Sequence, residues 1–352
     1  MRPRISKRGL VRASVRPSVG NAFGKICENW IFILNNLDNT SFKCHVSNVG
    51  SDEEEGATRR KERRGLEKIK ELLEDASLTA SVLFKRINFQ SKVAIDPNRP
   101  CNSCDPCLAG RTHFCLTEGP RRAYGVQQNG GCAEFIVVPK DVVYLVHRLP
   151  SKEAVLVEPV SCIIRGMDNL GEIDKNGRVL IQGAGIIGLL WLCILHHEGC
   201  RDLTISDVAE GRRQLVADLK LLPSVRVVDA ADLEGIVEAF DVVVDCSGNS
   251  GAIENALELL RRGGKLSIFS CCPTDAKVTF SPFELYRKEL TIVSSFINPL
   301  TFERAIDLVT RLNESGYLEL DKLGVELFCL ADVHAALADL SRGKISKAVF
   351  AL

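Results

Sequence analysis

Four cysteines of the chain are spaced as ligands of one metal ion. Cys101, Cys104, Cys107 and Cys115 form the pattern C-x2-C-x2-C-x7-C within a stretch that is rich in proline and glycine. Four thiolates suit tetrahedral zinc, and prolines and glycines supply the turns that wrap a short segment around an ion. A full set of four protein ligands leaves no open coordination position, so the pattern predicts a structural zinc site. Free thiols and an iron–sulfur cluster are the alternatives.

A second pattern joins three glycines to a carboxylate. Gly183, Gly185 and Gly188 spell G-x-G-x-x-G directly after the apolar run Val179–Gln182, and Asp207 follows the next such run. The glycines permit a tight turn and a close approach of backbone to a pyrophosphate, which rests on a helix N-terminus. The carboxylate can accept hydrogen bonds from ribose hydroxyls and would repel a 2′-phosphate, so we expect NAD rather than NADP. A glycine turn needed only for packing is the alternative.

Four further side chains are candidate cofactor contacts. Ser247 lies in a turn that follows the strand-like run Asp241–Asp245, and ligands of parallel sheets lie beyond the carboxyl ends of the strands. The other three candidates are Ile187 in the glycine turn, Arg212 after Asp207, and Phe296.

The elements that must position these residues alternate between strand and helix. The predicted strands are Val179–Gln182, Leu203–Ser206, Val225–Val228, Asp241–Asp245, Lys265–Phe269 and Leu290–Val293, and Lys347–Leu352 is predicted as a terminal strand. Helical stretches such as Gly251–Arg262 separate them, at a spacing of roughly 20–25 residues that is typical of a doubly wound parallel sheet. The fold class is therefore α/β.

Composition narrows the classes of partner. The 352 residues contain 45 Lys and Arg against 45 Asp and Glu, so no overall field attracts phosphate. No apolar run reaches the ~18 residues that a membrane span needs. We expect a small-molecule ligand, and neither nucleic acid nor a membrane as partner.

Residues 1–90 differ in character from the rest of the chain. They carry abrupt charge blocks and one stretch with helical spacing, Arg63–Leu78, which predicts an amphipathic helix. The first 27 residues contain several arginines and no Asp or Glu. Such a composition also occurs in mitochondrial transit peptides, so mitochondrial import is the alternative to a cytoplasmic location.

From about Ser91 to Leu352 the chain resembles the zinc-dependent medium-chain dehydrogenases, nearest the sorbitol (polyol) dehydrogenase group. The runs VAIDPNRPCNSCDPCLAGRTHFC, LVEPVSC and VLIQGAGIIG carry the resemblance. It implies a GroES-like catalytic domain over 91–159 and 299–352, a Rossmann NAD-binding domain over 160–298, and a segment 1–90 without a counterpart. It also implies hydride transfer between NAD and a secondary alcohol or polyol, and a homodimer or homotetramer.

The chain departs from this family at the catalytic zinc. The family holds that ion with a cysteine in a G-x-C-G-[ST]-D segment and with the His-Glu of a G-H-E segment, and neither motif occurs here. Cys44 and His45 are adjacent and lack the family's spacing. Glu158, in LVEPV, matches a family glutamate at or beside the metal and is the remnant of the catalytic site. Ile297 and Asn298 stand where sorbitol-type enzymes present Arg-Tyr toward substrate.

Two functions therefore remain open. One is an NAD-dependent, zinc-containing alcohol or polyol dehydrogenase whose activity is impaired by missing catalytic zinc ligands. The other is a catalytically silent NAD-binding protein, or a product with a replaced N-terminal segment, which keeps the structural zinc and the cofactor site.

Overall fold

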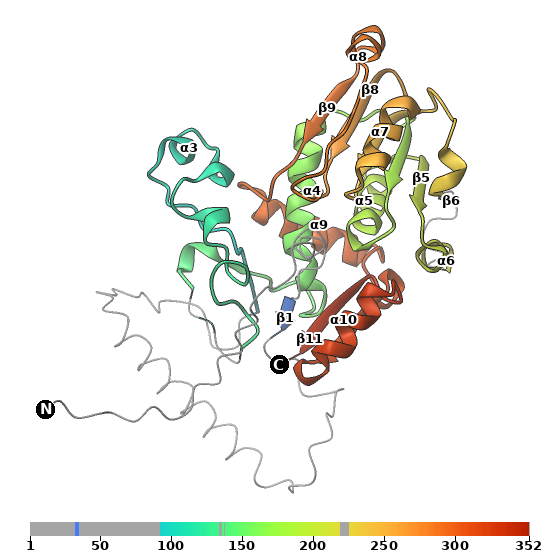
Figure 1. Cartoon of the computed structure of the whole chain (residues 1–352). Coiled ribbons are helices and arrows are strands. Elements are labelled where there is room, and N and C mark those ends of the chain that lie inside the picture. Colours follow the sequence, from blue (N-terminus) through green and yellow to red (C-terminus); the bar gives the residue numbers. More distant parts are fainter. Residues whose placement is uncertain (1–31, 35–91, 134–135, 137, 219–224, 352) are drawn as a thin grey trace, which may run out of the picture.

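A six-stranded sheet dominates the computed structural model, which describes residues 32–34, 92–133, 136, 138–218 and 225–351 (Figure 1). Its order is β6-β5-β4-β7-β8-β9, and every neighbouring pair of strands is parallel. The strands are β4 (Arg178–Gln182), β5 (Asp202–Asp207), β6 (Arg226–Asp229), β7 (Phe240–Asp245), β8 (Leu260–Ile268) and β9 (Thr291–Ser294). This order confirms the predicted parallel sheet.

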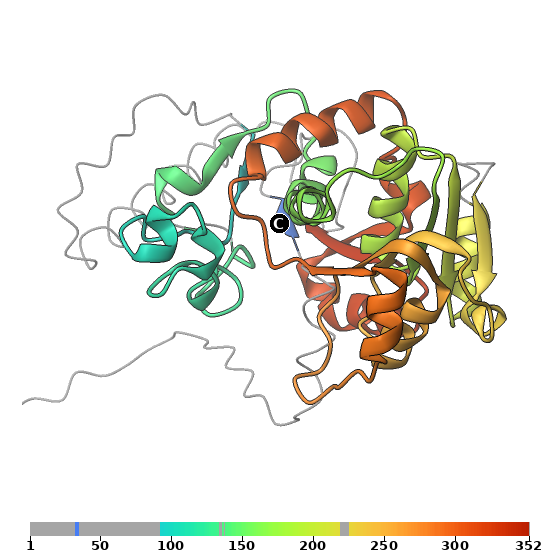
Figure 2. The same ribbon diagram turned by 90° about the horizontal axis from the view of Figure 1, so that it is seen from above.

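Helices cover both faces of this sheet (Figure 2). Successive side chains of a strand point to opposite faces, and the central strand β4 is apolar in both directions. Ile181 packs in the same buried cluster as Trp191 of α5, whereas Leu180 packs with Ile253 of α7 on the other face. Burial on both faces explains why the strands are continuous apolar runs rather than alternating ones.

The α-helices of the described residues are α3 (Asp105–Leu108), α4 (Val157–Leu170), α5 (Ile186–His197), α6 (Glu210–Asp218), α7 (Ser250–Leu259), α8 (Pro282–Lys288), α9 (Phe302–Glu314) and α10 (Val333–Ser341).

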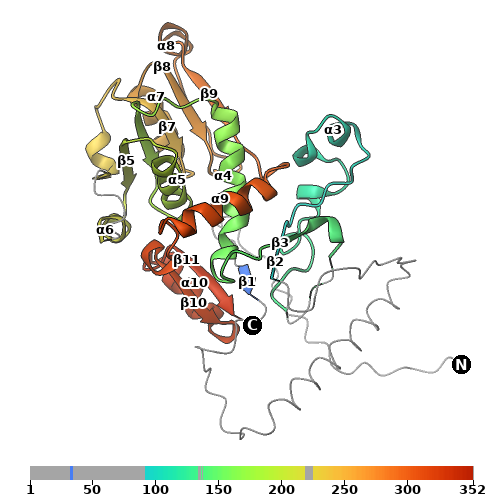
Figure 3. The same ribbon diagram turned by 180° about the vertical axis from the view of Figure 1, so that it is seen from behind.

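Two smaller sheets accompany the large one. Strands β2 (Val93–Ile95) and β3 (Val143–Leu145) pair antiparallel below the cysteine-containing lobe that carries α3 (Figure 3). Strand β11 (Lys347–Ala351) lies between β10 (Val325–Cys329) and β1 (Phe32–Leu34), parallel to both. The predicted terminal strand is confirmed over the described residues.

One predicted element has a different end in the structure. The helix expected over Gly251–Arg262 ends at Leu259, and Leu260 begins β8 by pairing with Phe240 of β7. Gly263 has a φ of +75°, a conformation outside the helical region, so the helix does not extend through it. The predicted helix over Arg63–Leu78 and the acid-free first 27 residues lie outside the described residues.

Within the described part of the chain, no helix is both long and apolar enough to cross a membrane.

Gly188 sets the distance between α5 and β4. A Cβ atom at this position would lie 1.9 Å from the carbonyl oxygen of Gly183. We expect Gly188→Ala to lower the free energy of unfolding by about 3 kcal/mol, because backbone rather than a flexible side chain must move. Gly211→Ala is the matched control, since nothing lies within 4 Å of that Cβ position. Equal urea midpoints for Gly188→Ala and the parent chain would contradict the packing role.

Candidate cofactor cleft and metal centre

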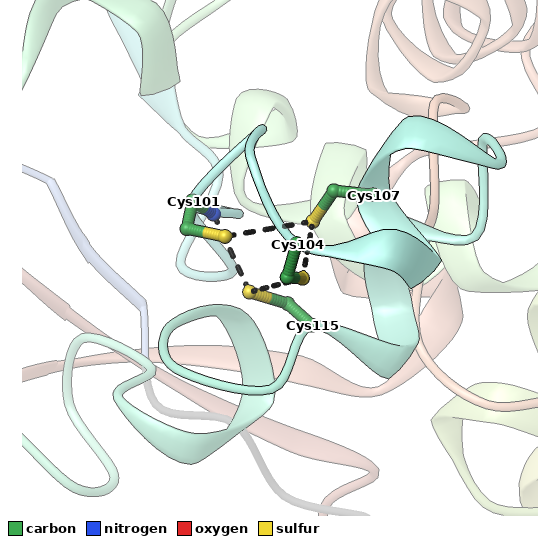
Figure 4. Close-up of side chains that lie close together, drawn as sticks. All are labelled: Cys101, Cys104, Cys107 and Cys115. Carbon is green, nitrogen blue, oxygen red and sulfur yellow. Dashed lines mark hydrogen bonds between the residues drawn. The ribbon is translucent and has the colours of Figure 1, made fainter.

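The four predicted cysteine ligands come together in one cluster (Figure 4). Their sulfur atoms all lie within 4.8 Å of one another. The Cys104 sulfur is 3.5 Å from that of Cys107 and 3.9 Å from that of Cys115, and the sulfurs of Cys101 and Cys107 are 4.0 Å apart. Tetrahedral zinc with bonds of about 2.3 Å would separate its sulfur ligands by about 3.8 Å. The cluster therefore fits one zinc ion.

Local structure brings these sulfurs together. Cys104 is the N-cap of the single-turn helix α3, and Gly110 with a φ of +73° turns the chain back after it. Backbone N–H groups of Cys101 and Glu118 donate to the Cys115 sulfur at 3.4 and 3.3 Å. Such donors stabilise thiolates, which are the form that binds metal. In the described residues this is the one group of three or more His, Cys, Asp or Glu side chains with metal-binding geometry.

A cavity of about 890 Å³ lies at the carboxyl edge of the large sheet. Six of the eight predicted cofactor residues line it, namely Gly183, Gly185, Ile187, Asp207, Arg212 and Ser247. Residues of the chain's C-terminal part, among them Gly343 and Ser346, also line it. This is the place where parallel α/β sheets bind nucleotides.

The N-terminus of α5 opens into this cavity. Its N-cap is Gly185, which offers no side-chain oxygen to the N–H groups of the first turn. Gly183 has a φ of +100°, and a Cβ there would lie 2.9 Å from the Cys246 carbonyl oxygen, so the turn requires glycine. Uncapped N–H groups and the positive end of the helix dipole suit a phosphate.

The Asp207 carboxylate is buried at the edge of the same cavity and is held from two directions. One oxygen accepts from the backbone N–H of Ala184 and the other from that of Ala209, both at 2.8 Å. The Arg212 guanidinium lies 3.4 Å from the first oxygen. The Asp207 carboxylate thus connects the glycine turn to the loop after β5. These hydrogen bonds fix its orientation and hold its negative charge at the cavity.

Gly188 and Phe296 are not among the residues that line the cavity. Gly188 faces the Gly183 carbonyl, as described above, and Phe296 follows β9 with half of its surface exposed. Their assignment as cofactor contacts stays a prediction.

Sequence reasoning missed Asp245, which organises the turn that carries Ser247. Asp245 is fully buried at the end of β7, and one of its oxygens accepts from both the N–H and the hydroxyl of Ser247, at 3.0 and 2.6 Å. The Ser270 hydroxyl donates to its other oxygen. The signal was available, because an acidic residue that ends an apolar strand is expected to be bonded when buried.

Glu158, which the sequence assigns to the remnant of a catalytic site, is buried beside a thiol and near an ammonium group. It is buried in the first turn of α4, and the Cys162 thiol donates to it across 3.6 Å. Burial raises the pKa of Glu158 to about 7, against the opposing effect of the Lys347 ammonium. Burial also lowers the pKa of Lys347 to about 8. Among the described residues, no third metal ligand joins Glu158 in a metal-binding group. Cys44 and His45 lie outside the described residues.

Comparison with known families and proteins agrees with this fold. The model of the zinc-binding dehydrogenase family matches residues 187–311, and that of the alcohol dehydrogenase GroES-like domain matches residues 85–151. The chain belongs to the zinc-binding medium-chain dehydrogenase family.

Its relatives include dehydrogenases named for polyols. D-altritol 5-dehydrogenase of Agrobacterium fabrum is 36% identical over 208 residues, which are 58% of this chain and 60% of that protein. D-arabinitol dehydrogenase 1 of Uromyces fabae is 26% identical over 261 residues, 72% of each chain. This chain thus spans less than two thirds of the altritol enzyme's length.

A solved structure shows the same architecture. A Sinorhizobium meliloti protein assigned to the zinc-binding dehydrogenases, and bound to NADP, superimposes with a TM-score of 0.64 at 28% identity. The match covers 72% of this chain and 74% of that one.

The cysteine cluster yields a direct test. We expect Cys104→Ser to lower both the zinc content and the stability of the protein, because a hydroxyl is a poor substitute for a thiolate ligand. Metal analysis of the purified variant measures the first effect and thermal unfolding the second. Cys193→Ser, at a buried thiol outside the cluster, is the control for zinc content. An unchanged zinc content in Cys104→Ser would refute the site.

Proposed function

We propose that this chain is an NAD-binding member of the polyol dehydrogenase lineage that carries one structural zinc and is a weak catalyst of alcohol oxidation. The observation that carries the proposal is the cavity at the carboxyl edge of the sheet, where the uncapped α5 N-terminus meets the Asp207 carboxylate. These two groups suit the two chemically distinct parts of a dinucleotide, its pyrophosphate and its adenosine ribose.

The preference for NAD over NADP rests on charge. The Asp207 carboxylate is a fixed acceptor for ribose hydroxyls, and a 2′-phosphate at the same place would be repelled. The Arg212 guanidinium lies 3.4 Å from the Asp207 carboxylate. The positive charge of Arg212 is therefore paired with that carboxylate. Zinc-binding dehydrogenases use NAD or NADP, and the buried carboxylate favours the first.

The expected weakness in catalysis rests on Glu158. Oxidation of an alcohol transfers hydride to the nicotinamide and must also remove the hydroxyl proton. A catalytic zinc lowers the pKa of a bound oxygen from ~16 toward 7, and it takes about three protein ligands. Among the described residues, the groups that act on Glu158 are Cys162, Lys347 and Asp96, and they form no set of three ligands with metal-binding geometry. Without a metal, the pKa of the alcohol hydroxyl is not lowered. Each pKa unit that is not lowered leaves deprotonation of the alcohol less favourable by about 1.4 kcal/mol.

A catalytically silent NAD-binding protein is the second candidate, and the same surroundings of Glu158 favour it. The two candidates share the cofactor cavity and the cysteine cluster, and they differ only in turnover.

Substrate, domains and assembly follow from the family by analogy. We propose a polyol as the small molecule, because relatives are named for altritol and arabinitol. We also propose a GroES-like part over 91–159 and 299–352 and a Rossmann part over 160–298, supported by the separate small sheets and the large one. A homodimer or homotetramer is proposed on the same basis.

The cofactor assignment is tested by titrating NAD and NADP against the fluorescence of the protein. We expect NAD to bind at least about 10-fold more tightly, which corresponds to about 1.4 kcal/mol. Asp207→Asn should narrow the difference, because it removes the charge that repels the 2′-phosphate. Asp229→Asn changes another carboxylate that lines the cavity. It should leave the ratio of the NAD and NADP affinities near that of the parent chain. Equal affinities in the parent chain would contradict the assignment.

The catalytic assignment is tested by introducing the family's ligand motifs for the catalytic zinc, which do not occur in this sequence. We expect one tightly bound zinc per chain and an alcohol oxidation rate far below that of an intact relative. Replacing residues 1–90 by a family segment that bears the cysteine and His-Glu motifs should add a second zinc and raise NAD reduction together. Metal analysis and NADH absorbance over a panel of polyols provide the measurements. Two zincs with an ordinary enzymatic rate in the chain as it stands would refute this proposal.

A further inference from the structure

A buried asparagine connects two parts of the protein that lie far apart in sequence. Asn298 follows β9, has only 2% of its surface exposed, and hydrogen-bonds two side chains at the start of the cysteine lobe. Its Nδ2 donates to the Asp96 carboxylate at 3.2 Å, and its Oδ1 accepts from the Asn98 Nδ2 at 3.0 Å. Both functional ends of the amide are used, so this side chain is committed to the lobe.

The two partners belong to the network that shapes the lobe. Asp96 accepts from the backbone N–H of Asn98 at 2.9 Å. One residue further on, the carbonyl oxygen of Arg99 accepts from Gly119 at 2.6 Å, which closes the lobe just beyond its fourth cysteine. The position of Asn98 is therefore linked to the loop that holds the four sulfurs.

The other end of the connection reaches the cofactor cavity. The N–H of Ser295 donates to the Ile268 carbonyl at the end of β8. The two residues after Ile268 donate their backbone N–H groups to the Asp245 carbonyl, and the Asp245 carboxylate holds Ser247 at the cavity wall. Hydrogen bonds therefore run from the cavity wall through the strand ends to the segment that carries Asn298.

This segment is held in a conformation that it would not adopt alone. Ile297 has a φ of +46° and Leu300 a φ of +59°. Positive φ is rare for bulky residues, and for a β-branched one it indicates strain that the surroundings impose. Thr301 fixes the far end, because its hydroxyl donates to the Ser161 carbonyl of α4 at 2.7 Å. Without the bonds of Asn298, the segment between β9 and Thr301 is free to relax.

We propose that Asn298 is a positioning residue that couples the zinc lobe to the cofactor cleft, so that bound zinc and bound NAD strengthen each other. The inference rests on the proposed function, because it takes the cysteine cluster as a zinc site and the cavity as an NAD site. Coupling between two sites is reciprocal, so each ligand changes the affinity of the other by the same factor.

The test compares the affinity for NAD of zinc-loaded and chelator-stripped protein, measured by fluorescence titration of the full chain. We expect removal of zinc to weaken NAD binding about 5-fold or more in the parent chain, the lower end of typical couplings. The coupling is expressed as the ratio of the NAD dissociation constants of the zinc-free and the zinc-loaded protein. In Asn298→Ala this ratio should fall close to one. Asn98→Ala removes the contact from the lobe side while the bond between Asn298 and Asp96 stays, and it should lower the ratio as well.

Asn169→Ala is the matched control. The Asn169 amide donates to the Ser294 carbonyl in β9 at 2.8 Å, so this variant loses a bond to the same strand without touching the lobe. It should keep the ratio of the parent chain. A parent ratio of one, with zinc and NAD both bound, overturns the coupling and leaves the proposed function intact. A ratio that persists in both Asn298→Ala and Asn98→Ala also overturns it. Failure of the parent chain to bind NAD overturns the proposed function and the coupling together.

Discussion

The close approach of α5 to β4 is the constraint on which the cofactor cleft depends. A Cβ atom at position 188 would lie 1.9 Å from the Gly183 carbonyl oxygen, so only glycine lets the helix begin directly at the strand end. This contact places the uncapped N–H groups of α5 at the carboxyl edge of the sheet. It also brings the N–H of Ala184 to the Asp207 carboxylate, so that one turn orders both the positive and the negative part of the cleft.

Much of this arrangement is predictable from the sequence because it is local. A strand, three glycines and a carboxylate after the next strand lie close together along the chain, and each has a physical reason for its position. The four cysteines lie within 15 residues and need only turns to meet. The sequence was less informative on the helix end at Leu259, where pairing of Leu260 with Phe240 overrides helical spacing.

Long-range polar contacts were beyond sequence reasoning. Asp96 and Asn298 are 202 residues apart, and no spacing rule predicts their contact. The Asn298 amide bonds to both Asp96 and Asn98 at the start of the cysteine lobe. Glu158 likewise interacts with residues that no local pattern predicts, because Lys347 lies 189 residues further along the chain.

The central claim is that the protein combines a cofactor cleft with one zinc site made only of sulfur. X-ray absorption at the zinc edge, recorded on the purified full chain with NAD present, tests it most directly, because the spectrum averages over every bound zinc ion. We predict a single shell of four sulfur atoms at about 2.3 Å. A substantial nitrogen or oxygen shell at about 2.0–2.1 Å would reveal a second zinc, held by ligands such as histidine or carboxylate, and would contradict the account.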